Sequence, residues 1–403
     1  MLSKFFGGVL YIQTFVANSH LDLSQYGSYL FLLILTVTLI PAILLGILQI
    51  KTKYYGFLVS IAMAVLLIWF ARMNFKYFVL FLVVELTLIM VYSLLVKKSK
   101  SKYLYFMFLV LSISPLIIYK FSDLFGYSFF GFLGLSYINF RAIQIIIELY
   151  DGSIEKVNFF DLFYFLTFFP TLSSGPIDRY RRFLDDINQK IPRKAYLCDL
   201  LPNGIKKIII GIGYKFVIAY LINTFWLTQI PSDHSFLNTV NYMYAYSFYL
   251  FFDFAGYSNF AVGTSYIMGV KTPVNFFLPF LSTSIKDFWT RWHITLSKWF
   301  GDYIYSRVTI DIMRKKLFKS RHTASYIAQL ITMLTMGAWH GLALNYLIYG
   351  LYHGLLLIGN DMYERKLPYY KRSKDNFKYQ IASVFVTFQL VCFGFLIFSG
   401  YLI

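Results

Sequence analysis

The sequence predicts an all-α, polytopic integral membrane protein, and three observations support that fold class. Of its 403 residues, 58% are hydrophobic and only 14% are charged, whereas a soluble domain carries about 25% charged residues. The apolar residues form many runs of the length that a spanning helix needs, about 20 residues. The basic residues gather between those runs. Together these observations exclude a cytosolic enzyme, a disordered chain and a nucleic-acid-binding module.

Seven apolar runs are clear candidates for spanning helices. They are residues 29–50, 54–71, 77–96, 103–119, 205–227, 326–358 and 381–403. The run at 326–358 is long enough to break into two helices. Three further runs are short or interrupted by polar residues, at 124–150, 159–176 and 237–268. We expect about 11 transmembrane helices, within a range of about 10 to 12, and some interrupted pieces that re-enter the membrane where protein surrounds them.

The charge pattern predicts orientation in the membrane rather than nucleic acid binding. The formal net charge is +18, from 37 Lys and Arg against 19 Asp and Glu. Of these 37 basic residues, 29 lie in five segments. The segments are residues 51–54, 97–102, 178–207, 286–322 and 361–378. Because loops rich in Lys and Arg stay in the cytoplasm, we expect these segments there and the N-terminus outside a multi-pass cell membrane protein.

No linker or repeat divides the chain, so residues 1–403 are expected to form a single membrane domain. Residues 1–27 include His20 and Asp22, a polar content that disfavours a cleaved signal peptide and suits an interfacial segment. Residues 274–322 interleave aromatic and charged side chains. That pattern is typical of helices at the depth of the lipid headgroups, so this segment is expected to form cytoplasmic or interfacial helices.

Several ionisable residues lie inside apolar runs, where each costs roughly 2.5–3.5 kcal/mol unless it finds a partner or a cavity. On a helix, Arg141, Gln144 and Glu148 fall on one face, and the simplest interpretation is an internal ion pair that locks two helices. Three acidic residues are similarly placed: Glu85, Asp161 and Asp253. Together they predict an interior that is polar in places, as a tunnel would be.

Histidines at membrane depth are stronger candidates for catalysis than these other ionisable residues. His340 follows an apolar stretch and lies between Gly337 and Gly341, which leave space for a backbone or a substrate to approach the imidazole. A buried histidine is more often a packed core residue than a catalyst, and composition alone leaves both interpretations open. The same choice applies to His293 and to His353, which is equally well suited to helix packing.

The sequence lacks the motifs of several enzyme classes. The sequence has no G-x-S-x-G, no P-loop and no H-E-x-x-H, so a serine hydrolase, an ATPase and a zinc protease are unsupported. No Cys/His cluster has metal-ligand spacing, and Cys198 and Cys392 form no framework. A histidine that acts alone as general base on an already activated substrate remains open.

Six stretches in chain order carry a resemblance to a known family. They are 134–141 (GLSYINFR), 174–179 (SGPIDR), 252–258 (FDFAGYS), 288–297 (FWTRWHITLS), 339–341 (WHG) and 349–354 (YGLYHG). In these motifs the sequence resembles the membrane-bound O-acyltransferase family along essentially the whole chain. Within that family it is similar to the members that esterify teichoic acids of Gram-positive bacteria with D-alanine.

The resemblance implies a fold, a reaction and partners. It implies a ring of helices around a thin core with a central tunnel, His340 as the essential histidine and general base, and His293 as the second catalytic position. The donor would be D-alanine held as a thioester on the phosphopantetheine arm of a small acidic carrier protein. The chain itself would then bind no cofactor or metal. Lipoteichoic acid would be the acceptor, with an accessory membrane-anchored partner and a small membrane peptide as further candidates.

Residues 286–322 are the candidate surface for the carrier protein. They hold 9 basic and 3 acidic residues, and an apolar centre with a basic rim suits an acidic helix. The candidate contacts are Val308, Thr309, Ile310, Arg314, Lys315 and Arg321. The alternative is that this loop is basic only because of its topology. Two other functions also stay open: O-acetylation of an exopolysaccharide, and a non-catalytic channel or flippase for an aminoacylated species.

Overall fold

The computed structural model describes residues 23–70, 75–124, 131–318, 320–367, 370, 373 and 375–403. Residues 1–22 of the predicted interfacial N-terminal segment lie outside this part of the chain. All regular secondary structure in the described residues is helical, without a strand. The all-α class that the hydropathy pattern predicted is therefore confirmed for them.

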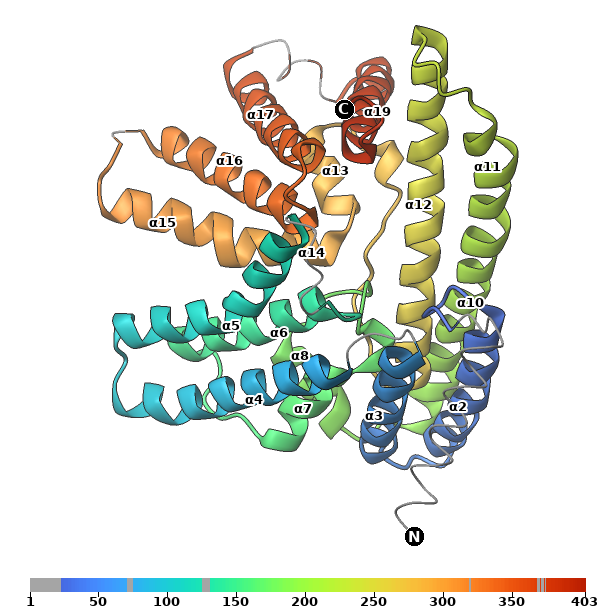
Figure 1. Cartoon of the computed structure of the whole chain (residues 1–403), viewed down its shortest axis with the longest axis vertical. Coiled ribbons are helices and arrows are strands. Elements are labelled where there is room, and N and C mark those ends of the chain that lie inside the picture. The colour runs from blue at the N-terminus through green and yellow to red at the C-terminus, as the bar shows by residue number, and fades with distance from the viewer. Residues whose placement is uncertain are drawn as a thin grey trace.

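The N-terminal third forms helices at each of the predicted apolar runs. These helices are α2 (Tyr29–Ile47), α3 (Lys53–Phe70), α4 (Phe75–Lys98) and α5 (Lys102–Leu124). The Ser28 side chain caps α2 by accepting from the Phe31 amide, which satisfies one of the free N–H groups at the helix start. In Figure 1, α4 and α5 lie crosswise to the long upright helix α12 (Phe236–Ile267).

The long helix α12 packs along α10 (Leu201–Ile212), as Figure 1 shows. Residues 193–229 run as one nearly continuous helical segment in which π-helical turns precede and follow α10. Gly204 and Gly263 face each other, and a Cβ on Gly204 would lie 2.9 Å from the Gly263 carbonyl oxygen. Small residues at such a contact allow two helix backbones to approach closely, as is common in membranes.

The predicted run at 326–358 breaks into two helices, α16 (Arg321–His340) and α17 (Leu344–Lys366). The last long helix is α19 (Phe377–Ser399). Five helices in the described residues are long and apolar enough to cross a membrane: Tyr29–Ile47, Phe75–Lys98, Lys102–Ser122, Arg193–Gln229 and Phe377–Ser399. The number of about 11 crossings and their arrangement in a ring stay predictions.

The run at 124–150 gives a short internal helix, α6 (Leu135–Asp151), in which every residue from 137 to 149 is buried. Its stripe of Arg141, Gln144 and Glu148 forms hydrogen bonds rather than the expected ion pair. Arg141 Nη1 donates to the Phe165 carbonyl (2.8 Å), and its Nη2 donates to the carbonyl and the hydroxyl of Thr171. Glu148 accepts from the hydroxyl of Tyr303.

The hydrogen bonds of Arg141, in place of an ion pair, have a physical reason in the adjacent segment of the same chain. The interrupted run at 159–176 gives a nine-residue helix, α7 (Phe159–Thr167), followed by a single 3-10 turn. Carbonyl groups at such a break have no partner within the helix, and buried carbonyls need donors. The buried guanidinium of Arg141 supplies them. This polar stripe therefore stabilises irregular backbone inside the protein.

The other acidic residues of the apolar runs each have a partner as well. Glu85 accepts from Ser112 (2.8 Å) and Asn139 (3.0 Å). The remaining two form ion pairs, Asp161 with Lys53 and Asp253 with Lys215. All three are thus accounted for by structural contacts.

Candidate active site

Short helices at the centre of the molecule carry the first candidate histidine. The segment predicted as interfacial helices forms α13 (Ile285–Arg291), α14 (Ile294–Phe300), a π-helical turn (Gly301–Tyr305) and α15 (Ser306–Arg314). Ser284 caps α13 by accepting from the Asp287 amide. Asp287 also pairs with Arg291 across one turn at 2.8 Å, as its spacing predicts.

His293 is the residue between α13 and α14. Its backbone is in the left-handed conformation, with φ 42° and ψ 52°, which is uncommon for a residue other than glycine. Its side chain is 4% exposed and packs edge-on against Phe254, with ring centroids 4.8 Å apart. The buried Nε2 atom has no hydrogen-bond partner among the described residues. A strained backbone and an unpaired polar atom together are typical of a functional position.

His340 is the last residue of α16. Its ring lies between aromatic side chains, with centroids 4.5 Å from Trp339 and 4.9 Å from Phe398. Lys120 of α5 donates to the His340 carbonyl oxygen at 3.0 Å, which anchors this helix end. The structure assigns the ring nitrogens no hydrogen bond to any described residue, so they are free to meet a substrate.

The glycines beside His340 serve the packing of α17 rather than a substrate. A Cβ on Gly337 would overlap the Tyr346 carbonyl oxygen, and a Cβ on Gly341 would lie 2.5 Å from the Tyr346 ring. Of the two uses expected for the space beside the imidazole, the structure therefore shows the approach of a backbone. It fixes the position of His340 at the junction of α16 and α17.

The two candidate catalytic histidines come from segments far apart in sequence and lie near each other. His293 and His340 lie close enough for a charge on one imidazole to act on the other. The structure thus brings together the pair that the resemblance singled out. Two imidazoles in one largely apolar region are able to hold a carbonyl group and accept a proton from a hydroxyl.

His353 of α17 has a different setting. It is completely buried against Trp289 and Tyr349, at centroid distances of 5.3 and 4.6 Å. A Cβ on Gly394 of α19 would overlap its Nε2 atom. The structure therefore places His353 in the contact between α13, α17 and α19. Of the two interpretations of this histidine, catalysis or helix packing, its position agrees with helix packing.

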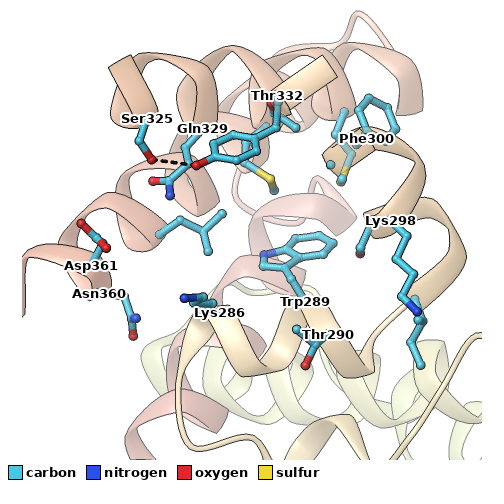
Figure 2. Close-up of a pocket in the computed structure, with 17 residues that line it drawn as sticks. Lys286, Trp289, Thr290, Lys298, Phe300, Ser325, Gln329, Thr332, Asn360 and Asp361 are labelled. Atoms are coloured by element: carbon cyan, nitrogen blue, oxygen red, sulfur yellow. Dashed lines mark hydrogen bonds between the residues drawn. The ribbon is translucent and has the colours of Figure 1, made fainter. Parts of the chain in front are cut away.

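A cavity of about 400 Å³ lies between α13, α14, α16 and α17. Figure 2 shows Trp289 of α13 and Gln329 of α16 on its facing walls, with Lys286 and Asn360 near its rim. The residues of α16 that line it are Ser325, Gln329, Thr332, Met333 and Met336. They recur every three to four residues along one helix face, and the next position on that face is His340.

The candidate carrier surface is on α15, which directly follows the π-helical turn whose Tyr305 lines this cavity. Val308, Thr309 and Ile310 are in α15, within the segment that was predicted to form helices. Ile310 is 54% exposed, and the apolar side chains that follow are exposed as well, Met313, Leu317 and Phe318. The predicted basic residues Arg314, Lys315 and Arg321 are also exposed. The described part of the segment therefore presents the apolar centre and basic rim that its sequence suggested.

Sequence reasoning missed the residues that line the cavity, above all Lys286, Trp289 and Gln329. The helical spacing along α16 up to His340 carries the signal that would have revealed one wall. The opposite wall comes from α13 and α17, and no local pattern links those segments to α16. No group of His, Cys, Asp and Glu among the described residues is placed to hold a metal ion.

Comparisons with known proteins identify the family of this chain. The family model of the membrane-bound O-acyltransferases matches residues 96–403. The teichoic acid D-alanyltransferase of Bacillus subtilis (strain 168) is 41% identical over 94% of this chain and 98% of its own length. That of Streptococcus thermophilus is 37% identical over 94% and 96%. The probable alginate O-acetylase of Pseudomonas putida is 34% identical over only 54% and 43%. The chain belongs to the membrane-bound O-acyltransferase family, as a membrane-embedded acyltransferase.

Proposed function

We propose that this protein transfers D-alanine from the phosphopantetheine thioester of a carrier protein to a hydroxyl group, for the D-alanylation of teichoic acid. The observation that carries the proposal is the cavity along α16, which is lined by Tyr305 directly before α15 and by Met336 one helical turn before His340. The two relatives named as teichoic acid D-alanyltransferases match this chain over nearly its full length.

His340 acts as the general base in this proposal. The acceptor oxygen attacks the thioester carbon while an imidazole nitrogen takes the hydroxyl proton. Collapse of the tetrahedral intermediate forms the ester, breaks the carbon–sulfur bond and returns that proton to the leaving thiolate. A positioned general base contributes typically about 10²–10⁴-fold to the rate. The donor arrives already activated, which suits a site without a nucleotide-binding motif.

His293 has a supporting role. Its buried Nε2 has no partner among the described residues, so a protonated Nε2 is available to donate to the thioester carbonyl. A donor aimed at the oxygen where negative charge develops stabilises the transition state. The backbone at His293 is left-handed, and its ring is buried against Phe254.

The carrier protein docks on α15 and the residues that follow it. The exposed side chains of Ile310, Met313 and Phe318 form the apolar centre, with Arg314 and Lys315 at the rim. Such a surface attracts an acidic partner over a distance and then buries its apolar contacts. Its position beside the cavity lets a flexible arm reach from the carrier toward His340.

The membrane topology follows from this arrangement. The basic segments that contain α8 (Tyr180–Asn188) and α15 would face the cytoplasm, where the carrier is charged, and the N-terminus would lie outside. The hydroxyl acceptor, ultimately lipoteichoic acid, would reach His340 from the other side through a central tunnel. An accessory membrane-anchored partner and a small membrane peptide would assist that last transfer.

Two other functions are less well supported. The alginate O-acetylase relatives match 54–66% of this chain and less than half of their own length, so acetylation of an exopolysaccharide is the weaker candidate. Membership of an acyltransferase family argues against a non-catalytic channel or flippase.

The experiment replaces the chromosomal gene with a His340→Ala variant and measures D-alanyl esters in the cell wall. We expect the esters to be lost at normal protein level. His322→Ala is the matched control, because this histidine is exposed at the start of α16, and it should leave the ester content unchanged. Normal ester content in the His340→Ala strain would refute the role of His340.

A further inference from the structure

The end of α16, which carries His340, is held by a contact from outside the helix. Gly341 has an extended backbone, with φ 179° and ψ 164°, so the helix stops at His340. The last four carbonyl groups of a helix have no partner within it, and the carbonyl of His340 is one of them. Its oxygen accepts a hydrogen bond from Nζ of Lys120 at 3.0 Å, from a residue 220 positions away in the sequence. The residue that carries the imidazole is therefore tied to α5.

A bend in α5 brings Lys120 to this contact. Pro115 lies inside α5, and a proline within a helix removes a backbone hydrogen bond and kinks the helix. Figure 1 shows the last part of α5 turned away from the crosswise direction of the first part, toward the tip of α16. Lys120 follows the proline by five residues. The kink therefore directs this lysine to the end of another helix.

The surroundings of Lys120 are largely apolar. Between Lys102 and Asp123, it is the only charged residue of α5. It lines a largely apolar cavity of about 390 Å³ that Leu342 also lines. An ionisable side chain in such a place is costly unless it finds a partner, and a hydrogen bond is electrostatically stronger where water is excluded. The His340 carbonyl supplies such a partner, so we expect this bond to be retained rather than exchanged for water.

The ammonium group of Lys120 also lies near the imidazole. It is close enough for its charge to act on the ring of His340, and a cation at the C-terminus of a helix is favoured by the helix dipole. Trp339, the preceding residue of α16, lines the same cavity as Lys120. The contact is thus made beside the ring that the proposed reaction uses, rather than at a distant turn.

We propose that Lys120 is a positioning residue for His340. The inference rests on the proposed function, in which the imidazole takes the proton of the acceptor hydroxyl. A bond at the carbonyl oxygen fixes the backbone from which that ring projects, and a misplacement of about 1 Å can cost about 10²-fold in rate. Because Lys120 holds His340 and lies outside the α15 surface, its loss should lower kcat and leave carrier affinity unchanged.

The test measures turnover and carrier affinity on the same protein. Full-length protein in lipid nanodiscs is given D-alanyl-carrier, lipoteichoic acid and the accessory partner, and kcat is measured from ester formation. Lys120→Met removes the ammonium group but keeps a side chain of similar length. We expect kcat to fall about 10²-fold, with the carrier dissociation constant unchanged. Lys120→Arg keeps a cationic donor and should recover most of the lost rate.

Lys76→Met is the matched control, because Lys76 is an exposed lysine at the start of another apolar helix, α4, and it should leave kcat unchanged. Unchanged carrier binding shows that a variant is folded. If Lys120→Met loses carrier binding, Lys120→Gln, which has a shorter and uncharged donor, takes its place in the comparison. Wild-type kcat in the folded variant overturns the inference, and so does a loss that Lys120→Arg does not recover. A wild-type protein that forms no ester contradicts the proposed function itself.

Discussion

The docking surface on α15 yields a prediction that is worked out from a single side chain. Ile310 is 54% exposed in the free protein, so about half of its apolar surface remains to be buried by a partner. Full burial of an isoleucine is worth roughly 1.5–3 kcal/mol. Loss of the remaining half in Ile310→Asn therefore weakens carrier binding by about 0.8–1.5 kcal/mol, or roughly 4- to 12-fold.

The aspartate variant separates charge from apolar contact. Ile310→Asp has nearly the shape of Ile310→Asn but adds a negative charge facing an acidic partner, so we expect its dissociation constant to rise further than that of the asparagine variant. Apo-carrier is the titrant, measured by biolayer interferometry, and Ile310→Val serves as the conservative control. Because an exposed side chain contributes little to folding, thermal stability should stay within about 0.5 kcal/mol of wild type. Unchanged carrier affinity in Ile310→Asp would refute the docking surface.

Three further predictions follow from the same structure. Carrier affinity should fall steeply from 50 mM to 500 mM salt, since the Debye length shrinks from about 14 Å to about 4 Å; a flat salt dependence would exclude the basic rim as a docking determinant. Arg141→Leu should destabilise the protein by roughly 3–5 kcal/mol because it leaves several buried carbonyls unpaired, measured as a lower midpoint of thermal unfolding in detergent, whereas exposed Arg181→Leu should change it little. Gly337→Ala should lower both stability and activity by forcing α16 away from the Tyr346 carbonyl, while Gly359→Ala, with open space around it, should be tolerated; equal midpoints for these two variants would contradict the close helix contact.

The sequence predicted the helices well and their lengths less well. Apolar runs such as 77–96 and 381–403 appear as α4 and α19 within a few residues. A long apolar segment in a membrane forms a helix because its backbone groups must find their hydrogen bonds within the segment. The run at 124–150 shows the limit of this reasoning. Hydropathy does not distinguish a lipid-facing helix from an internal one, and α6 is buried on every side.

The sequence identified the candidate histidines, but it did not predict how they are arranged in space. Family motifs pointed to His293 and His340, and composition alone left their roles open. Their proximity depends on the packing of distant segments, which no local pattern encodes. The same reason explains why Trp289 and Gln329 were missed, since each is an ordinary residue of an amphipathic segment until the opposite wall is known.

The measurement that tests the central claim most directly follows the thioester itself. Purified protein in nanodiscs is mixed with D-alanyl-carrier and lipoteichoic acid together with the accessory partner, and both thioester loss and ester formation are recorded for wild type and His340→Ala. The account predicts ester formation by wild type and a fall of about 10²–10⁴-fold in the variant, with carrier affinity preserved. Wild-type rates in the His340→Ala protein would contradict it.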